Sequence, residues 1–169
     1  MTKKPLNIKI HFNLLFMAKK GSYVIKLSRE IEKWLKPYSK KIKIVGSIRR
    51  KEKNPKDIDI VIIPKNKEDI LNFLKTRGKF IQGGEKKLTF QIRGVKTEIY
   101  YTDEKSWGAT LLAYSSKKGA AIGLRMLARF KGYKLNQYGL FKNEKYISGK
   151  KERDIYNSLN KKYRLPKYR

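Results

Sequence analysis

Two aspartates separated by one residue, Asp57 and Asp59, are the residues of this chain best placed to do chemistry. They belong to residues 57–63, whose alternating pattern predicts a β-strand, and residues two apart on a strand project to the same side. Two aligned carboxylates repel each other unless a cation lies between them. The pair therefore indicates a metal site. The alternative, a strand whose solvent-facing side is simply acidic, fits poorly in so basic a chain.

A glycine and a serine, Gly46 and Ser47, precede this strand and follow residues 41–45, which alternate like a half-buried strand. A glycine leaving a strand permits close backbone approach, and exposed amides with a hydroxyl suit phosphate oxygens. Arg50 follows and can hold a phosphate through two hydrogen bonds. A glycine-serine turn is common by itself, but together with the two aspartates it predicts a nucleotide-phosphate site.

A site for two metal ions usually needs a third carboxylate that orients the attacking hydroxyl. Residues 95–102 are predicted to form a strand on which Glu98 shares a face with Tyr100 and Thr102. Asp103 is the alternative, but it has the opposite parity and lies at the end of the strand. Glu98 is therefore the predicted third ligand, and a set made only of carboxylates favours a hard cation such as magnesium.

Charge is the strongest signal in the composition. The chain has 43 Lys and Arg against 14 Asp and Glu, a formal net charge of +29. These cations are scattered over the expected strands and helices, which favours a nucleic-acid partner over a lipid surface. A basic nucleic-acid-binding protein without catalysis is the alternative. Cysteine is absent, and the only histidine, His11, has no second histidine beside it and is predicted to be structural.

Membrane association is not expected, because no run of about 20 apolar residues occurs. The first residues also lack the apolar run of a secretory signal. We therefore expect an intracellular protein, although the sequence does not indicate its compartment. We also expect it to act as a monomer.

The chain divides into an α+β half, residues 1–104, and a mostly helical half, residues 105–169. Residues 1–20 are ambiguous. The remaining elements are expected to be a helix at 22–35, strands at 41–45 and 57–63, a helix at 67–75, strands at 79–82, 86–92 and 95–102, helices within 106–131 broken near Ser115, a short hairpin at 134–141 and a final helix at 151–160.

Cations in the second half are candidates for DNA contacts. Lys117 and Lys118 begin a predicted helix, where charge and free backbone amides suit phosphate. Arg125 and Arg129 are four residues apart and share a face of that helix. Solvated surface charge is the alternative for Arg125.

The sequence resembles the X family of DNA polymerases over roughly residues 40–169, in collinear order. The resemblance rests on Gly46-Ser-Ile-Arg-Arg50 with Asp57-Ile-Asp59, Thr97-Glu-Ile-Tyr100, Trp107-Gly-Ala-Thr-Leu-Leu112, Leu124-Arg125, Gly132-Tyr-Lys-Leu-Asn-Gln-Tyr-Gly-Leu-Phe141 and the tail from Glu152 to Pro166. It implies a nucleotidyltransferase palm over residues 1–104, with a mixed β-sheet and helices on one face. A small, mostly helical thumb would follow over residues 105–169.

The resemblance also implies roles in the palm. Asp57 and Asp59 would hold two Mg²⁺ ions, for which Mn²⁺ is a substitute, and would bridge them to the triphosphate. Glu98 would bind the catalytic ion and align the primer 3′ hydroxyl. Ser47 and Arg50 would hold the β and γ phosphates, beside the turn at Gly46.

In the thumb, the resemblance implies contacts to nucleotide and DNA. Tyr114 would approach the incoming sugar, and Arg125 would touch the template side of the minor groove. Asn136 and Tyr138 would line the pocket near the new base pair, although core packing is the alternative for Tyr138.

The function implied is that of a DNA-directed DNA polymerase that binds primed or gapped DNA and deoxynucleoside triphosphates, with gap filling in DNA repair. A nucleotidyltransferase acting on RNA, a protein or a small molecule is an alternative. Two features depart from the family: Glu98 replaces an aspartate, and Ala113-Tyr-Ser-Ser-Lys117 replaces Tyr-Phe-Thr-Gly-Ser. About 40 residues precede the palm motif. They are too few for the lyase domain that larger members carry, so the chain resembles the compact viral members.

Overall fold

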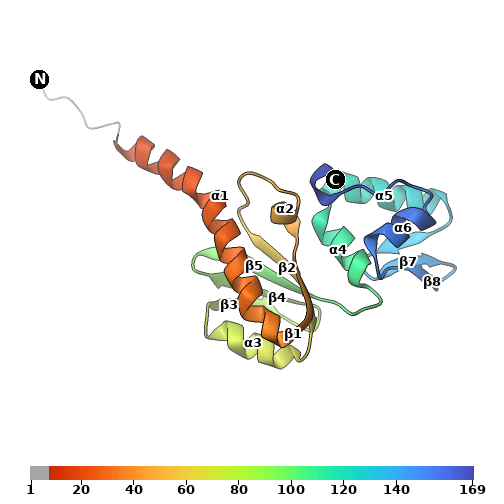
Figure 1. The fold of residues 1–169 in the computed structure, drawn as a ribbon, viewed down its shortest axis with the longest axis horizontal. Helices are drawn as coiled ribbons and strands as arrows, with labels where there is room; N and C mark the ends of the chain where they lie inside the picture. The colour runs from red at the N-terminus through yellow and green to blue at the C-terminus, as the bar shows by residue number, and fades with distance from the viewer. Residues whose placement is uncertain (1–7) are drawn as a thin grey trace, which may run out of the picture.

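The computed structural model describes the backbone of residues 8–169 and the side chains of residues 21–169. A five-stranded mixed sheet with helices forms the N-terminal half, and helices with a three-stranded sheet form the C-terminal half (Figure 1). The predicted α+β class is thereby confirmed. His11 lies outside the residues whose side chains are described.

The N-terminal half contains α1 (Ile8–Leu35), η1 (Lys36–Tyr38), β1 (Ser39–Ile44), α2 (Gly46–Arg49), β2 (Ile58–Pro64), α3 (Lys67–Lys75), β3 (Lys79–Gly83), β4 (Lys87–Ile92) and β5 (Val95–Tyr101). The C-terminal half contains α4 (Trp107–Ser115), α5 (Lys118–Phe130), β6 (Lys134–Asn136), β7 (Gly139–Lys142), β8 (Lys145–Ser148), α6 (Glu152–Ser158) and η2 (Pro166–Tyr168).

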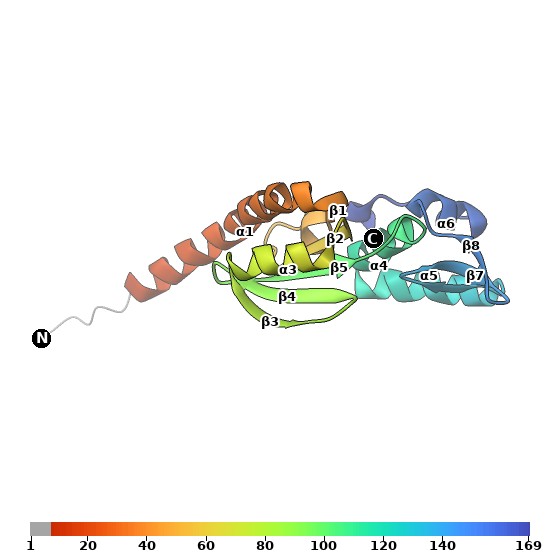
Figure 2. The ribbon, with the colours of Figure 1, turned by 90° about the horizontal axis from the view of Figure 1, so that it is seen from below.

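Helix α1 covers one face of the large sheet. Its residues Val24, Leu27, Ile31 and Leu35 repeat at helical spacing and are at most 1% exposed. Each such burial contributes roughly 1.5–3 kcal/mol. Helix α3 packs on the same face, as Figure 2 shows, so the opposite face of the sheet is left for other contacts. Helix α1 starts at Ile8, well before the predicted residue 22.

The large sheet has the order β1-β2-β5-β4-β3, in which only the central pair, β2 and β5, is parallel. Side chains alternate between the two faces along β2 and β5, so Ile58, Ile60 and Ile99 lie in the core under the helices. The same alternation places Asp59 and Glu98 on the opposite face. The register pairs these two acidic residues directly.

The C-terminal half has its own core between α4, α5, α6 and the small sheet. Strand β8 was not predicted. The turn before it uses Asn143 and Glu144, both with positive φ, so the glycine that usually marks such a hairpin turn is missing. Among the described residues, no helix is both long and apolar enough to cross a bilayer.

The two halves meet on the face of the large sheet that lacks α1 and α3. Val45 and Val61 from the sheet side and Leu111 from α4 are buried together there. Tyr100, Trp107 and Tyr114 pack around them. The segment between β5 and α4 connects the halves beside this contact, and the predicted boundary between residues 104 and 105 lies in this segment.

Candidate active site

Asp59 and Glu98 lie side by side because parallel strands β2 and β5 pair them in register. The Tyr100 hydroxyl lies 3.3 Å from Asp59 Oδ1 and 3.1 Å from Glu98 Oε2, so this hydroxyl can donate to either carboxylate. Asp57, immediately before β2, adds its negative charge to the surroundings of Asp59. The structure thus brings Asp59 and Glu98 together, and Asp57 lies close enough for its charge to act on Asp59.

Electrostatics at this site favour a cation. Burial raises the pKa of Asp59 to about 6, and the negative charges of Asp57 and Glu98 act in the same direction. A divalent ion would reverse this effect by stabilising the ionised carboxylate. The donor set contains oxygen only, which fits a hard cation.

Glu98 already has positive charge beside it. Lys87 Nζ lies 2.7 Å from Glu98 Oε1, and Lys96 Nζ lies 3.3 Å from Oε2. Burial alone would raise the pKa of Glu98, but hydrogen bonds from Lys87 and Tyr100 outweigh it and lower the pKa. Within the described part of the chain, no group of three His, Cys, Asp or Glu side chains is already arranged as a metal site. A cation would therefore compete with these two lysines for Glu98.

The glycine-serine turn lies directly against the acidic pair. Gly46 has a φ of +62°, and a Cβ added there would clash with Asp59 Oδ2. Gly46 begins a single helical turn, α2, where the sequence indicated only a phosphate-binding turn. The Ser47 Oγ atom is buried without a hydrogen-bond partner, which suits a hydroxyl that receives a ligand.

Gly46→Ala is expected to lower both stability and any activity of the site. A left-handed conformation costs a residue with a side chain about 1–2 kcal/mol, and the clash displaces Asp59 in addition. Gly84→Ala is the matched control, because no atom lies within 4 Å of a Cβ added there. Thermal unfolding measures the effect, and equal stability of the two variants would contradict the close contact between the turn and Asp59.

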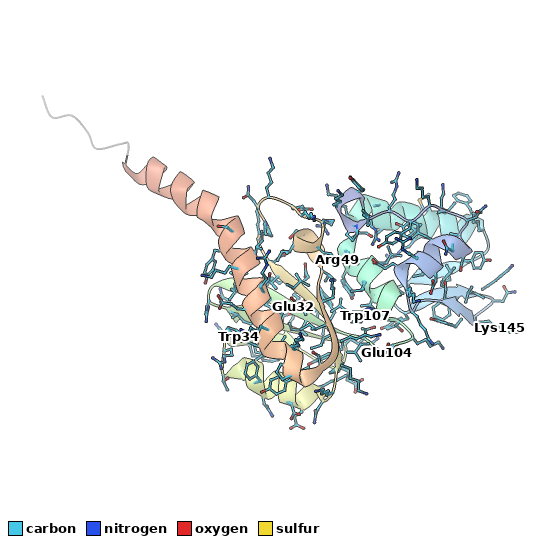
Figure 3. All side chains as sticks on the ribbon, in the orientation of Figure 1. Glu32, Trp34, Arg49, Glu104, Trp107 and Lys145 are labelled. Carbon is cyan, nitrogen blue, oxygen red and sulfur yellow. The ribbon has the colours of Figure 1, made fainter. Side chains whose placement is uncertain are left out.

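The two arginines after the turn point to different partners. Arg50, the predicted phosphate ligand, pairs through Nε with Glu52 Oε1 at 2.8 Å. Arg49, for which the sequence suggested no role of its own, lies where the halves meet (Figure 3). Its guanidinium makes two hydrogen bonds to Glu152, of 2.9 and 2.6 Å, and one of 2.7 Å to Ser115 Oγ.

Glu152 is the centre of a buried cluster that joins the two halves. Besides Arg49, it accepts hydrogen bonds from Arg169 Nη1 at 2.6 Å and from the Tyr163 hydroxyl at 3.1 Å. Burial alone would raise the pKa of Glu152, but the two arginines outweigh it and lower the pKa. Local sequence patterns contain no signal for these contacts, because Arg49 and Glu152 are 103 residues apart.

The predicted nucleotide contacts of the C-terminal half face the same region in part. Tyr114 stacks on Tyr100 with ring centroids 3.8 Å apart, which connects α4 to the acidic pair. Asn136 and Arg125 line one small cavity between α4, α5 and β6. Tyr138 is 42% exposed, and so is not a core residue.

The predicted DNA-binding cations are all on the surface. Lys117, Lys118, Arg125 and Arg129 are exposed on or next to α5. Lys86, from the turn between β3 and β4, lies 5.7 Å from the centre of the Tyr138 ring. Both halves therefore contribute cations around the region between the acidic pair and α5.

Comparison with known proteins decides the family. The family model of the DNA polymerase beta thumb matches residues 110–169. Repair DNA polymerase X of African swine fever virus is 33% identical over 150 residues, which cover 80% of this chain and 84% of the viral protein. The chain belongs to the X family of DNA polymerases. It is accordingly a nucleotidyltransferase of the palm-and-thumb type.

Solved structures agree with this X-family fold. Leishmania infantum polymerase beta in a ternary P/T complex has a TM-score of 0.74 at 21% identity, over 86% of this chain and 75% of that one. Its ternary gap complex has a TM-score of 0.73 at 19% identity, over 86% and 69%. In the X-family polymerase, the large sheet with its helices is thus the palm, and the C-terminal half is the thumb.

Proposed function

We propose that this X-family polymerase fills gaps in DNA during repair, by adding deoxynucleotides to a primer 3′ hydroxyl. The observation that carries the proposal is the register of β2 and β5, which pairs Asp59 with Glu98 beside the Gly46 turn. Support comes from the viral relative, which is named a repair polymerase, and from the similar fold of polymerase beta in a gap complex.

In this proposal, Asp57, Asp59 and Glu98 hold two Mg²⁺ ions, with Mn²⁺ as a substitute. When bound, these ions supply positive charge that activates the attacking hydroxyl and neutralises the triphosphate. The protein supplies position: the Ser47 hydroxyl has no internal partner and is free to receive a phosphate oxygen. Arg50 would exchange Glu52 for the triphosphate, because a phosphate carries more negative charge than one carboxylate.

The thumb residues would complete the nucleotide site. Tyr114 approaches the sugar from α4, where its stacking on Tyr100 fixes its ring beside the acidic pair. Asn136 and Tyr138 lie near the new base pair. We treat the enzyme as an intracellular monomer, because copies with a net charge of +29 repel each other and its substrate is DNA.

Primer extension on gapped DNA tests the proposal. With Mg²⁺ and the four deoxynucleoside triphosphates, the protein is expected to fill a short gap by template-directed addition. Single-stranded DNA without a template and a primed RNA template are the comparison substrates. No extension on gapped DNA, with the folded state confirmed, would favour a nucleotidyltransferase for another acceptor.

Binding of DNA is expected to weaken steeply with salt. Each phosphate neutralised by a lysine or arginine contributes about −0.9 to the slope of log affinity against log salt. If the cations around α5 and Tyr138 contact six or more phosphates, the slope is roughly −5 or steeper. Fluorescence anisotropy with gapped DNA at several salt concentrations measures it. A flat profile would contradict a role for these cations in binding.

A further inference from the structure

Three apolar side chains form a stripe on the solvent side of α5. Ile122, Met126 and Phe130 are four residues apart in turn, so they follow one face of the helix. They are 45%, 53% and 84% exposed. The opposite face of α5 packs into the thumb core through Ala128, with Leu124 and Leu127 beside it. We call Ile122, Met126 and Phe130 the α5 stripe.

The surroundings of the α5 stripe are strongly basic. The sequence from residue 105 to residue 143 contains no Asp or Glu. Arg125 and Arg129 are exposed on α5 next to the stripe, and Lys118 is exposed at its start. An exposed apolar surface bordered by cations fits a partner that combines flat apolar groups with negative charge. Unpaired nucleic-acid bases on a phosphate backbone have this chemistry.

The position of α5 connects the α5 stripe to the active site. Ser115, at the end of α4 and just before α5, hydrogen-bonds Arg49 of the palm at 2.7 Å. From there α5 runs outward along the edge of the thumb (Figure 2). Arg125, in the middle of α5, lines the cavity that also includes Asn136. A strand that leaves the active site along α5 would therefore meet the stripe.

We propose that the α5 stripe binds unpaired bases of the template strand beyond the primer end. The bases would stack on Phe130 and Met126, while Arg125 and Arg129 pair with the adjoining phosphates. Gly119 and Gly123 leave open space, since nothing lies within 4 Å of a Cβ added at either, so a strand can lie close to the helix. This inference rests on the proposed function, because it requires a template.

A second copy of this chain is a poor occupant of the α5 stripe. Both copies would carry a net charge of +29, and the cations beside the two stripes would face each other. A protein partner would need acidic groups on both sides of an apolar surface. A binding experiment with abasic DNA separates a protein partner from DNA, because its readout depends on the presence of bases.

The experiment measures binding by fluorescence anisotropy, without nucleotide, so no catalysis is involved. One primed duplex carries a 5′ template overhang of ordinary bases, and a second carries the same overhang with abasic sites. Each base that stacks on a side chain adds to the affinity for DNA. The wild type is therefore expected to bind the ordinary overhang about tenfold more tightly than the abasic one. The double variant Met126→Ser/Phe130→Ser is expected to lose this preference and to bind both overhangs equally.

Two further variants sharpen the result. Ile81→Ser is the matched control, because Ile81 is 50% exposed on palm strand β3, and it is expected to keep the wild-type preference. Phe130→Tyr retains a ring and is also expected to keep it. Equal affinity of the wild type for both overhangs, or an unchanged preference in the double variant, would overturn the inference. An active gap-filling enzyme without the preference would leave the proposed function intact, so the two failures are distinguishable.

Discussion

Asp59→Asn is expected to reduce the rate of nucleotide addition by about 10³-fold or more, because a metal ion contributes several kcal/mol of transition-state stabilisation. Asp59 has the central position, with Glu98 paired to it across the sheet and Asp57 before it. Binding of DNA should persist or tighten, since the change removes negative charge from a site that binds phosphate. Single-turnover extension and anisotropy measure the two effects separately.

The control for this variant is Asp69→Asn, the same change at an exposed residue in the first turn of α3. It is expected to leave extension unchanged. A loss of activity in Asp59→Asn through unfolding is not expected. The folded pKa of Asp59, about 6, lies above its ordinary value of 3.8, so the protonated form favours the fold. This contribution is complete below pH 3.8 and is lost as the pH rises through 6.

At pH 7 without metal, Asp59→Asn should therefore be at least as stable as the wild type. Thermal unfolding at pH 5 and pH 7 checks this sign. A variant that is markedly less stable than the wild type at pH 7, or one that keeps normal extension, would contradict the role given to Asp59.

Glu152→Gln is expected to destabilise the protein by about 3–5 kcal/mol, because it leaves two buried arginines without their counter-charge. Arg49 and Arg169 both lie against this carboxylate, and the side chain of Arg169 is 1% exposed. For a chain of this size the thermal midpoint should fall by roughly 10 °C. Because Arg49 belongs to the palm and Glu152 to the thumb, the variant should also loosen the thumb from the turn that contains Ser47.

Glu104→Gln supplies the matched comparison for Glu152. Glu104 pairs with Lys41 at 2.5 Å, but both side chains are about half exposed, so its loss should cost less than about 1 kcal/mol. The folded pKa of Glu152 lies below its ordinary value of 4.5, so its contribution to stability is present above pH 4.5. It is lost as the pH falls through the folded pKa. Equal midpoints for the two variants would contradict the structural role of the buried cluster.

Local patterns predicted the elements that carry the active site. The alternation around Asp59 and around Glu98 identified β2 and β5 and the face on which each carboxylate lies. Helix α3 was predicted with its observed bounds from the apolar face that it now buries, and the structure adds that Asn66 caps it by accepting a hydrogen bond from the Glu68 amide. Side-chain alternation and helical periodicity involve residues only a few positions apart, so they can be recognised in the sequence alone.

Contacts over long distances in the chain could not be predicted in this way. The parallel register that joins Asp59 to Glu98 depends on the packing of two strands separated by α3 and a hairpin. The stacking of Tyr100 on Tyr114 and the pair of Arg49 with Glu152 each join residues of different halves. Strand β8 was missed for a local reason, since its turn has no glycine.

The central claim is that Asp57, Asp59 and Glu98 hold two divalent ions. It is tested most directly by counting bound Mn²⁺ with electron paramagnetic resonance, in complexes with a chain-terminated gapped primer and the correct nucleotide. After subtraction of the ions held by DNA alone, we expect the wild type and Asp69→Asn to hold two ions per complex, one of them with the triphosphate, and Asp59→Asn to hold fewer. The same number of ions in Asp59→Asn as in the wild type would contradict the assignment of the site.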